Sequence, residues 1–186
     1  MRRPGRLVRL FTAAAEDLLA RCGNAGTYAT ADARVAPVHP WPAPVGGYKI
    51  RHYSLDVPED LKRFGRIWRS TNFMVNVMYP TQGPRDRTRM SPHHHDDFEQ
   101  CSLVLDGEYL HHLRWPWTVN MNHWREDEHV RCGTPSMAVI PPPAIHTSGA
   151  LDAGSNHLVD IFCGPRLDFS AKPGWVLNER EYRLPD

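Results

Sequence analysis

From residue 48 onward, apolar and polar residues alternate in short runs with a period of two, which is the pattern of half-buried β-strands. The longest run is interrupted by Asp106-Gly107, a dipeptide typical of a hairpin turn. Short strands between Gly- and Pro-containing turns predict an all-β sandwich or barrel, and periodicity alone does not choose between the two. The runs predicted as strands are residues 48–55, 72–80, 99–115, 136–143 and 157–165.

The first 47 residues have a different pattern. Residues 10–22 show helical spacing of apolar side chains and precede Gly23, so they predict a short helix. Residues 33–47 are rich in Pro, Ala and Gly, which indicates an extended linker. We therefore expect three parts: an N-terminal arm with a short helix over 1–47, a β-barrel over 48–165, and a C-terminal tail that packs on the barrel over 166–186.

Composition narrows the classes of partner and compartment. The chain has 186 residues, with 22 basic and 21 acidic side chains, so no nucleic-acid partner is expected. No apolar run approaches the roughly 18 residues that span a bilayer, so no membrane partner is expected either. Glu16 and Asp17 interrupt the basic N-terminus, which disfavours a secretory signal and leaves a transit peptide as the alternative. Four widely spaced cysteines predict free thiols in a reducing cytoplasm: Cys22, Cys101, Cys132 and Cys163.

A cluster of histidines carries the chemistry. His93 and His95 are two residues apart, so on a strand they point to the same face while His94 points away. With His146 as a third imidazole and an oxygen from Glu99 or Gln100, four protein ligands leave a position for water or substrate. This pattern predicts one divalent transition metal ion per chain, namely Fe, Zn, Mn or Ni. The alternative is a solvated, His-rich loop.

Two motifs in this order resemble the cupin superfamily over residues 70–165. The first is His93-x-His95, then Glu99-Gln100 and an apolar strand that ends at Gly107. The second starts at Gly133, continues through an apolar strand and ends with Pro141-Pro142-Pro143-Ala144-Ile145-His146. Pro143 stands where the family usually has glycine, and proline cannot take a positive φ there. The resemblance implies an all-β, cupin-type double-stranded β-helix (jelly-roll) barrel, a bound metal and a homodimer.

Two neighbouring residues, Glu99 and Gln100, are the candidates for the oxygen ligand. In the common family spacing it lies five residues after the second histidine and seven before the glycine, and both counts select Gln100. Glu99 fits only a shorter variant, although a carboxylate is the better ligand for a divalent cation. A subgroup of cupins, including the uronate-linearising enzymes of pectin breakdown, resembles this chain in having a Glu-Gln pair and uses the glutamine.

The expected function is a metal-dependent enzyme acting on a small oxygenated substrate, such as a carboxylate, a sugar acid or a keto or hydroxy compound, by isomerase or lyase chemistry. An Fe(II)-dependent dioxygenase and a non-catalytic ligand-binding cupin are the alternatives. Glu99 and Tyr109 are candidates for proton transfer. Arg114 is the candidate for binding a substrate carboxylate, with a surface salt bridge as its alternative.

The remaining histidines give weaker signals. His111 and His112 are adjacent in a predicted strand, so their side chains are expected to face opposite ways. His123 and His129 fall in a polar segment between the two motifs, for which an exposed loop is expected.

Overall fold

The computed structural model describes residues 5–30, 32–37 and 39–185. The chain divides into two compact units, Met1–Ala33 and Arg34–Asp186, which are described separately. The first unit contains α1 (Glu16–Leu19) and the short 3-10 helix η1 (Ala25–Tyr28). The helix predicted over 10–22 is therefore wrong in length, because a helix with no buried residue and no capping side chain has little to stabilise it in water. No described helix is long and apolar enough to cross a membrane.

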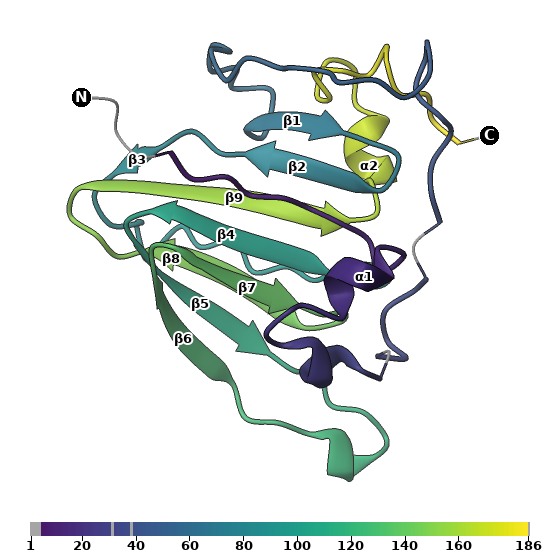
Figure 1. The fold of residues 1–186 in the computed structure, drawn as a ribbon. Coiled ribbons are helices and arrows are strands. Elements are labelled where there is room, and N and C mark those ends of the chain that lie inside the picture. Colours follow the sequence, from purple (N-terminus) through teal and green to yellow (C-terminus); the bar gives the residue numbers. More distant parts are fainter. Residues whose placement is uncertain (1–4, 31, 38, 186) are drawn as a thin grey trace. The chain divides into compact units, whose positions relative to one another are not determined.

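The second unit is built of antiparallel strands (Figure 1). One sheet has the order β1-β2-β9-β4-β7, with β3 also paired to β9, and the other has the order β6-β5-β8. The strands are β1 (Arg66–Arg69), β2 (Phe73–Val77), β3 (Thr81–Gln82), β4 (Gln100–Asp106), β5 (Glu108–Arg114), β6 (Glu128–Gly133), β7 (Ser136–Ile140), β8 (Ile145–Ala150) and β9 (Ser155–Cys163). A 3-10 turn, η2 (Met121–His123), precedes β6, and a short helix, α2 (Leu167–Ser170), follows β9.

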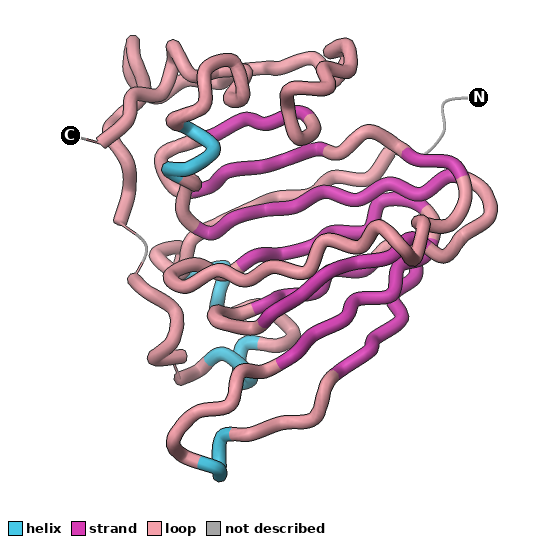
Figure 2. Tube along the Cα trace, turned by 180° about the vertical axis from the view of Figure 1, so that it is seen from behind, coloured by secondary structure: helices cyan, strands magenta, loops and turns pink. Residues whose placement is uncertain are grey.

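Figure 2 shows the strands of both sheets in magenta. The two sheets meet through apolar side chains. Val104 and Leu158 of the larger sheet pack with Tyr109 and Ala150 of the smaller one. The predicted all-β fold is confirmed by these two antiparallel sheets. The expected closed barrel is not observed, because the strands form two separate hydrogen-bonded sheets that do not close.

The expected hairpin at Asp106-Gly107 is a corner between the sheets. β4 pairs with β7 and β9, whereas β5 pairs with β6 and β8, so the two strands joined by Gly107 do not pair with each other. Gly107 has φ of 76°, and a Cβ there would lie 2.4 Å from the Asn156 side-chain oxygen. The dipeptide indicates a tight change of direction, but the partners of each strand are distant in sequence and leave no local pattern.

Residues 48–55 are not a strand, although their pattern alternates. Arg51 anchors this segment by donating to Glu181 Oε2 at 2.6 Å and to the Val45 carbonyl at 2.8 Å. Ile50 is fully exposed, so the alternation does not mark a buried face. Conversely, β6 and β8 are strands that the sequence pattern did not predict, because their many polar residues hide the alternation of apolar and polar positions.

The C-terminal segment belongs to the same unit and packs beside β1. Asn178 exchanges two hydrogen bonds with the Arg69 backbone, at 3.0 and 2.9 Å, and Val176 forms a parallel bridge with Ile67. Trp41, in the predicted linker, donates its backbone N–H to the Thr71 carbonyl at 2.7 Å. Residues that precede β1 in the sequence and residues that follow β9 therefore both pack on the strands of Arg34–Asp186.

Candidate metal centre

The three predicted histidines converge. His93 and His146 exchange both backbone hydrogen bonds, at 3.0 and 2.7 Å, although they are 53 positions apart in the sequence. The ring of His95 lies 5.1 Å from that of His93 and 5.3 Å from that of His146. One potential ligand atom from each histidine lies within 4.8 Å of the others. The expected strand over 93–95 is reduced to the single bridge at His93, yet the extended backbone still turns His93 and His95 toward the same point.

Backbone carbonyls orient two of the imidazoles. His93 Nδ1 lies 2.8 Å from the Ser91 carbonyl and His146 Nδ1 lies 2.9 Å from the Ala144 carbonyl. A carbonyl only accepts, so each Nδ1 carries the proton and each Nε2 keeps a lone pair. Burial lowers the pKa of His95 and of His146 to about 4. Both rings are therefore neutral at pH 7, which is the form that binds metal.

Gln100 supplies the oxygen that faces this cluster. Its amide nitrogen donates to Asp160 Oδ1 at 3.1 Å and to Ser102 Oγ at 3.2 Å, and Ser102 in turn donates to Asp160 at 2.9 Å. These contacts turn Gln100 Oε1 toward His95 Nε2 at 2.9 Å and toward His146 Nε2 at 3.3 Å.

Gln100 Oε1 and His146 Nε2 lie close together although neither atom carries a proton that the other could accept. Two lone pairs at 3.3 Å repel each other unless a cation lies between or beside them. Three imidazole nitrogens and one amide oxygen form a donor set that suits a divalent transition metal. The residues present therefore fit the expected ion.

Glu99 lies on the other side of the strand. Alternate residues of β4 are buried toward the smaller sheet, beginning with Gln100, and Glu99 precedes that series by one position. Its charge interacts with the thiols of Cys101 and Cys163, which belong to the opposite face. Among the described residues, the cluster of potential metal ligands does not include Glu99. The four cysteines are free thiols, as expected.

A pocket of about 460 Å³ opens over the cluster. Tyr109 lies on its wall, and burial raises the pKa of this phenol to about 12, so it stays protonated. Asp160 also lines the pocket, and burial raises its pKa to about 6. Other lining residues on the wall include Met78, Tyr79, Ser148, Leu158 and Phe162.

Two arginines line the same pocket. Arg85 donates to the Ser148 carbonyl at 2.9 Å, and Arg166 packs 3.6 Å from the centre of the Phe169 ring while it pairs with Asp168. Asp160 and the two arginines were not predicted from the sequence as residues of the site. A carboxylate inside the apolar run 157–163 was the available signal for Asp160, whereas neither arginine stands in a distinctive pattern.

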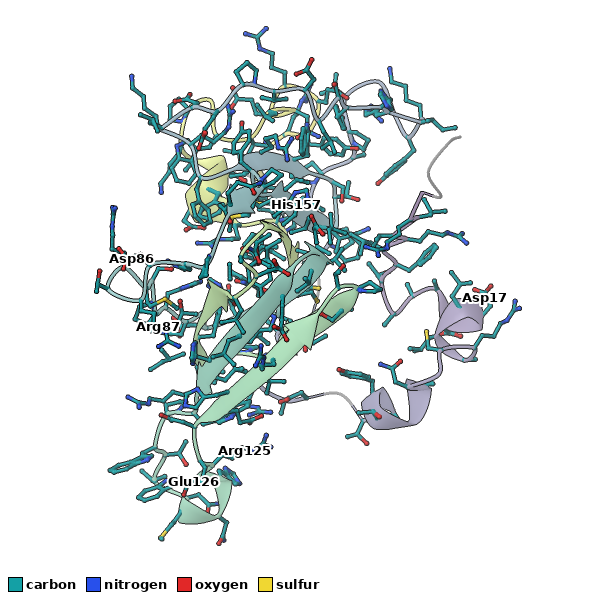
Figure 3. All side chains as sticks on the ribbon, turned by 90° about the vertical axis from the view of Figure 1, so that its left-hand side faces the viewer. Asp17, Asp86, Arg87, Arg125, Glu126 and His157 are labelled. Atoms are coloured by element: carbon teal, nitrogen blue, oxygen red, sulfur yellow. The ribbon has the colours of Figure 1, made fainter. Side chains whose placement is uncertain are left out.

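Arg114 lies outside this pocket. Its guanidinium pairs with Asp127, with Nε 2.9 Å from Oδ2, and its side chain is largely exposed. Asp127 lies in the connection between β5 and β6, and Figure 3 shows Arg125 and Glu126 near the tip of this connection. The structure thus places Arg114 in the surface ion pair that was the alternative to substrate binding.

His111 and His112 do face opposite ways. His111 is buried between the sheets with Nδ1 2.7 Å from Ser148 Oγ, whereas His112 lies on the outer face of the smaller sheet. His129 was expected in a loop but lies in β6, directly opposite His112. His123, by contrast, lies in the exposed β5–β6 connection, as expected.

No protein-family model and no curated protein matches the chain. Solved structures do resemble it. Its structural neighbours are cupin-domain proteins. One is a cupin-2 domain protein from Shewanella frigidimarina, with 14% identity over 50% of this chain and 72% of that chain, at a TM-score of 0.34. KdgF from Halomonas sp. has 20% identity over 54% of this chain and 88% of its own, at a TM-score of 0.35. Fe(II)-HppE has 10% identity over 49% of each chain, at a TM-score of 0.33. Similarities at this level do not assign an activity.

Proposed function

We propose that the chain is a metal-dependent cupin enzyme that converts a small carboxylate, sugar acid, or keto or hydroxy compound by isomerase or lyase chemistry. The observation that carries the proposal is the amide of Gln100, which Asp160 and Ser102 orient so that its oxygen joins the three histidines. An imidazole binds a metal in its neutral form, and an amide oxygen carries no net charge. A metal held by neutral donors keeps nearly its full charge and polarises an oxygen of the substrate.

The pocket supplies the other groups that this chemistry needs. The guanidinium group of Arg85 gives the pocket positive charge for a substrate carboxylate, whereas Asp168 offsets the charge of Arg166. Tyr109 holds a phenolic proton on the wall, and Asp160 is a carboxylate that accepts a hydrogen bond from the proposed ligand Gln100. We assign substrate binding to Arg85, because it lines the pocket and Arg114 does not.

The metal requirement is tested first. The chain, purified without an affinity tag, is stripped with chelator and reloaded with Fe(II), Zn, Mn or Ni, and bound metal is measured. We expect one tightly bound ion, which is lost in His146→Ala. The matched control is His94→Ala, because the side chain of His94 is 53% exposed, lies beside Asp96 and does not belong to the cluster. Equal binding by the His146→Ala protein and wild type would contradict the proposed site.

Turnover is tested next with a panel of uronates, aldonates, and keto and hydroxy acids. Product is followed by NMR, and dissolved oxygen by an electrode in the same samples. We expect conversion without oxygen uptake, and loss of conversion in His146→Ala but not in His94→Ala. Oxygen consumption coupled to turnover would replace the proposal with an Fe(II) dioxygenase. Saturable binding without any product would make the chain a ligand-binding cupin.

A further inference from the structure

A second pair of histidines lies on the outer face of the smaller sheet. His112 of β5 and His129 of β6 are directly opposite each other in the antiparallel register. Their Nδ1 atoms are 2.8 Å apart, and their ring centres are 4.9 Å apart. Successive residues of a strand alternate between faces, so this pair is separated by β5 from His111, which is buried on the inner face.

The spacing of the two nitrogens suits chelation. When two imidazoles bind one ion at adjacent positions, with metal–nitrogen bonds near 2.0–2.1 Å, their nitrogens lie about 2.9–3.4 Å apart. The pair at 2.8 Å reaches this range with a side-chain movement of a few tenths of an ångström. Both side chains are accessible to solvent, so an ion can reach them and keep water on its remaining positions.

The surroundings add oxygen donors. A shallow hollow of about 160 Å³ is lined by both histidines together with Asp127 and Thr147, and it also reaches His146 of the three-histidine centre. Thr147 of β8 lies opposite His112, and the Asp127 charge acts on His129. Arg114 holds the Asp127 carboxylate and offsets part of its charge, so Asp127 is a neighbour of the ion rather than a required ligand.

We propose that His112 and His129 form a second, solvent-accessible binding site for a divalent transition metal ion, whose ligands are distinct from those of the three-histidine centre. Imidazole donors select the borderline ions Ni, Cu and Zn over Mg and Ca. Two protein ligands leave most positions of the ion to water, so this site binds more weakly than the site with four protein ligands. The competing state is a direct hydrogen bond between the two Nδ1 atoms, one donating and the other accepting.

The test counts bound nickel on the full, metal-stripped chain by equilibrium dialysis across a range of free Ni²⁺. We expect two equivalents in wild type, a tight one and a weaker one. His129→Asn should lose only the weaker equivalent, and His112→Asn should do the same. The double variant His93→Ala/His95→Ala should lose only the tight one, because neither of these residues lines the hollow of the second site. His123→Asn is the matched control, because His123 is also an exposed histidine of the β5–β6 region but pairs with Asn120.

The outcomes separate the two sites. Circular dichroism of each variant checks the fold, and the two single variants serve as replicates should one of them fail to fold. Persistence of the weaker equivalent in both His112→Asn and His129→Asn, or its loss in His123→Asn, overturns the second site. One equivalent in wild type that survives His93→Ala/His95→Ala would overturn the three-histidine centre and leave the second site standing.

Discussion

At the scale of single residues, the side chain that governs the candidate centre is Asp160, which is not itself a proposed ligand. An amide can present either its oxygen or its nitrogen, and the two ends differ in chemistry but hardly in shape. Asp160 and Ser102 accept from the Gln100 nitrogen, which leaves the oxygen for the histidines. A buried residue that accepts two hydrogen bonds therefore decides whether Gln100 can act as a ligand.

The first prediction compares Gln100 with its neighbour. Gln100→Ala removes the oxygen that faces His95 and His146, so metal affinity should fall by at least the roughly 10–100-fold typical of an important supporting contact. Glu99→Gln should leave the affinity nearly unchanged, because Glu99 is outside the cluster. Competition with a chelating dye measures both. Loss of metal in Glu99→Gln alone would identify Glu99 as the ligand.

The second prediction concerns His111 and acid. Burial lowers the pKa of His111 below the value near 6.5 of an unfolded chain. As the pH falls below about 6.5, the unfolded chain binds the proton first, so stability is lost until the pH reaches the lower pKa of the folded state. One such group accounts for up to about 1.4 kcal/mol per pH unit.

Urea unfolding of the metal-free protein between pH 7.5 and pH 5 tests this second prediction. His111→Gln should lose less stability over that range than wild type, because its side chain cannot take up a proton. His123→Gln, at an exposed position, is the control and should follow wild type. Parallel curves for wild type and His111→Gln would show that His111 does not contribute.

At the scale of elements, the corner at Gly107 connects the strand that carries Gln100 to the strand that carries Tyr109 and His111. It therefore sets how the ligand-bearing sheet faces the pocket wall. Its positive φ and its close approach to Asn156 both require a residue without a side chain.

The third prediction is that Gly107→Ala destabilises the fold by roughly 1–3 kcal/mol, the cost of a strained backbone residue, and more if the contact with Asn156 does not relax. Urea unfolding measures the difference. Gly133→Ala is the control, because a Cβ there meets nothing within 4 Å. Equal stability of both variants would show that the corner tolerates a side chain.

At the scale of the whole molecule, the candidate ligands come from parts of the chain that only folding brings together. His93 and His95 precede β4, Gln100 begins it and His146 lies in β8 of the other sheet. An ion bound by all four links the two sheets, which share no backbone ladder. Since the unfolded chain has no such site, the binding free energy adds to stability.

The fourth prediction is that metal raises the melting temperature of the stripped protein. At a free concentration 100 times the dissociation constant, the gain is about 2.7 kcal/mol. Thermal unfolding with and without Zn measures it. The shift should disappear in His93→Ala/His146→Ala and persist in His94→Ala. An equal shift in the double variant would place the stabilising ion elsewhere.

The sequence by itself determined the chemistry and much of the local structure. The alternation of residues 72–80, 99–115, 136–143 and 157–165 predicted strands that are observed, and the spacing of His93, His95 and His146 predicted the cluster. The count that favoured Gln100 over Glu99 is matched by the side that each residue takes. These features are local: a buried face recurs every second residue, and a motif keeps its spacing in any context.

Only the tertiary structure decided the pairing of strands and everything that depends on it. Residues 48–55 alternate as β2 does, yet no partner strand accepts them, while β6 and β8 form from polar sequences because β5 offers its backbone to both. The corner at Gly107, the orientation of Gln100 by Asp160 and the pair His112–His129 all follow from the pairing. Hydrogen bonds between distant backbones set the register, and no short stretch of sequence records which distant segment will supply them.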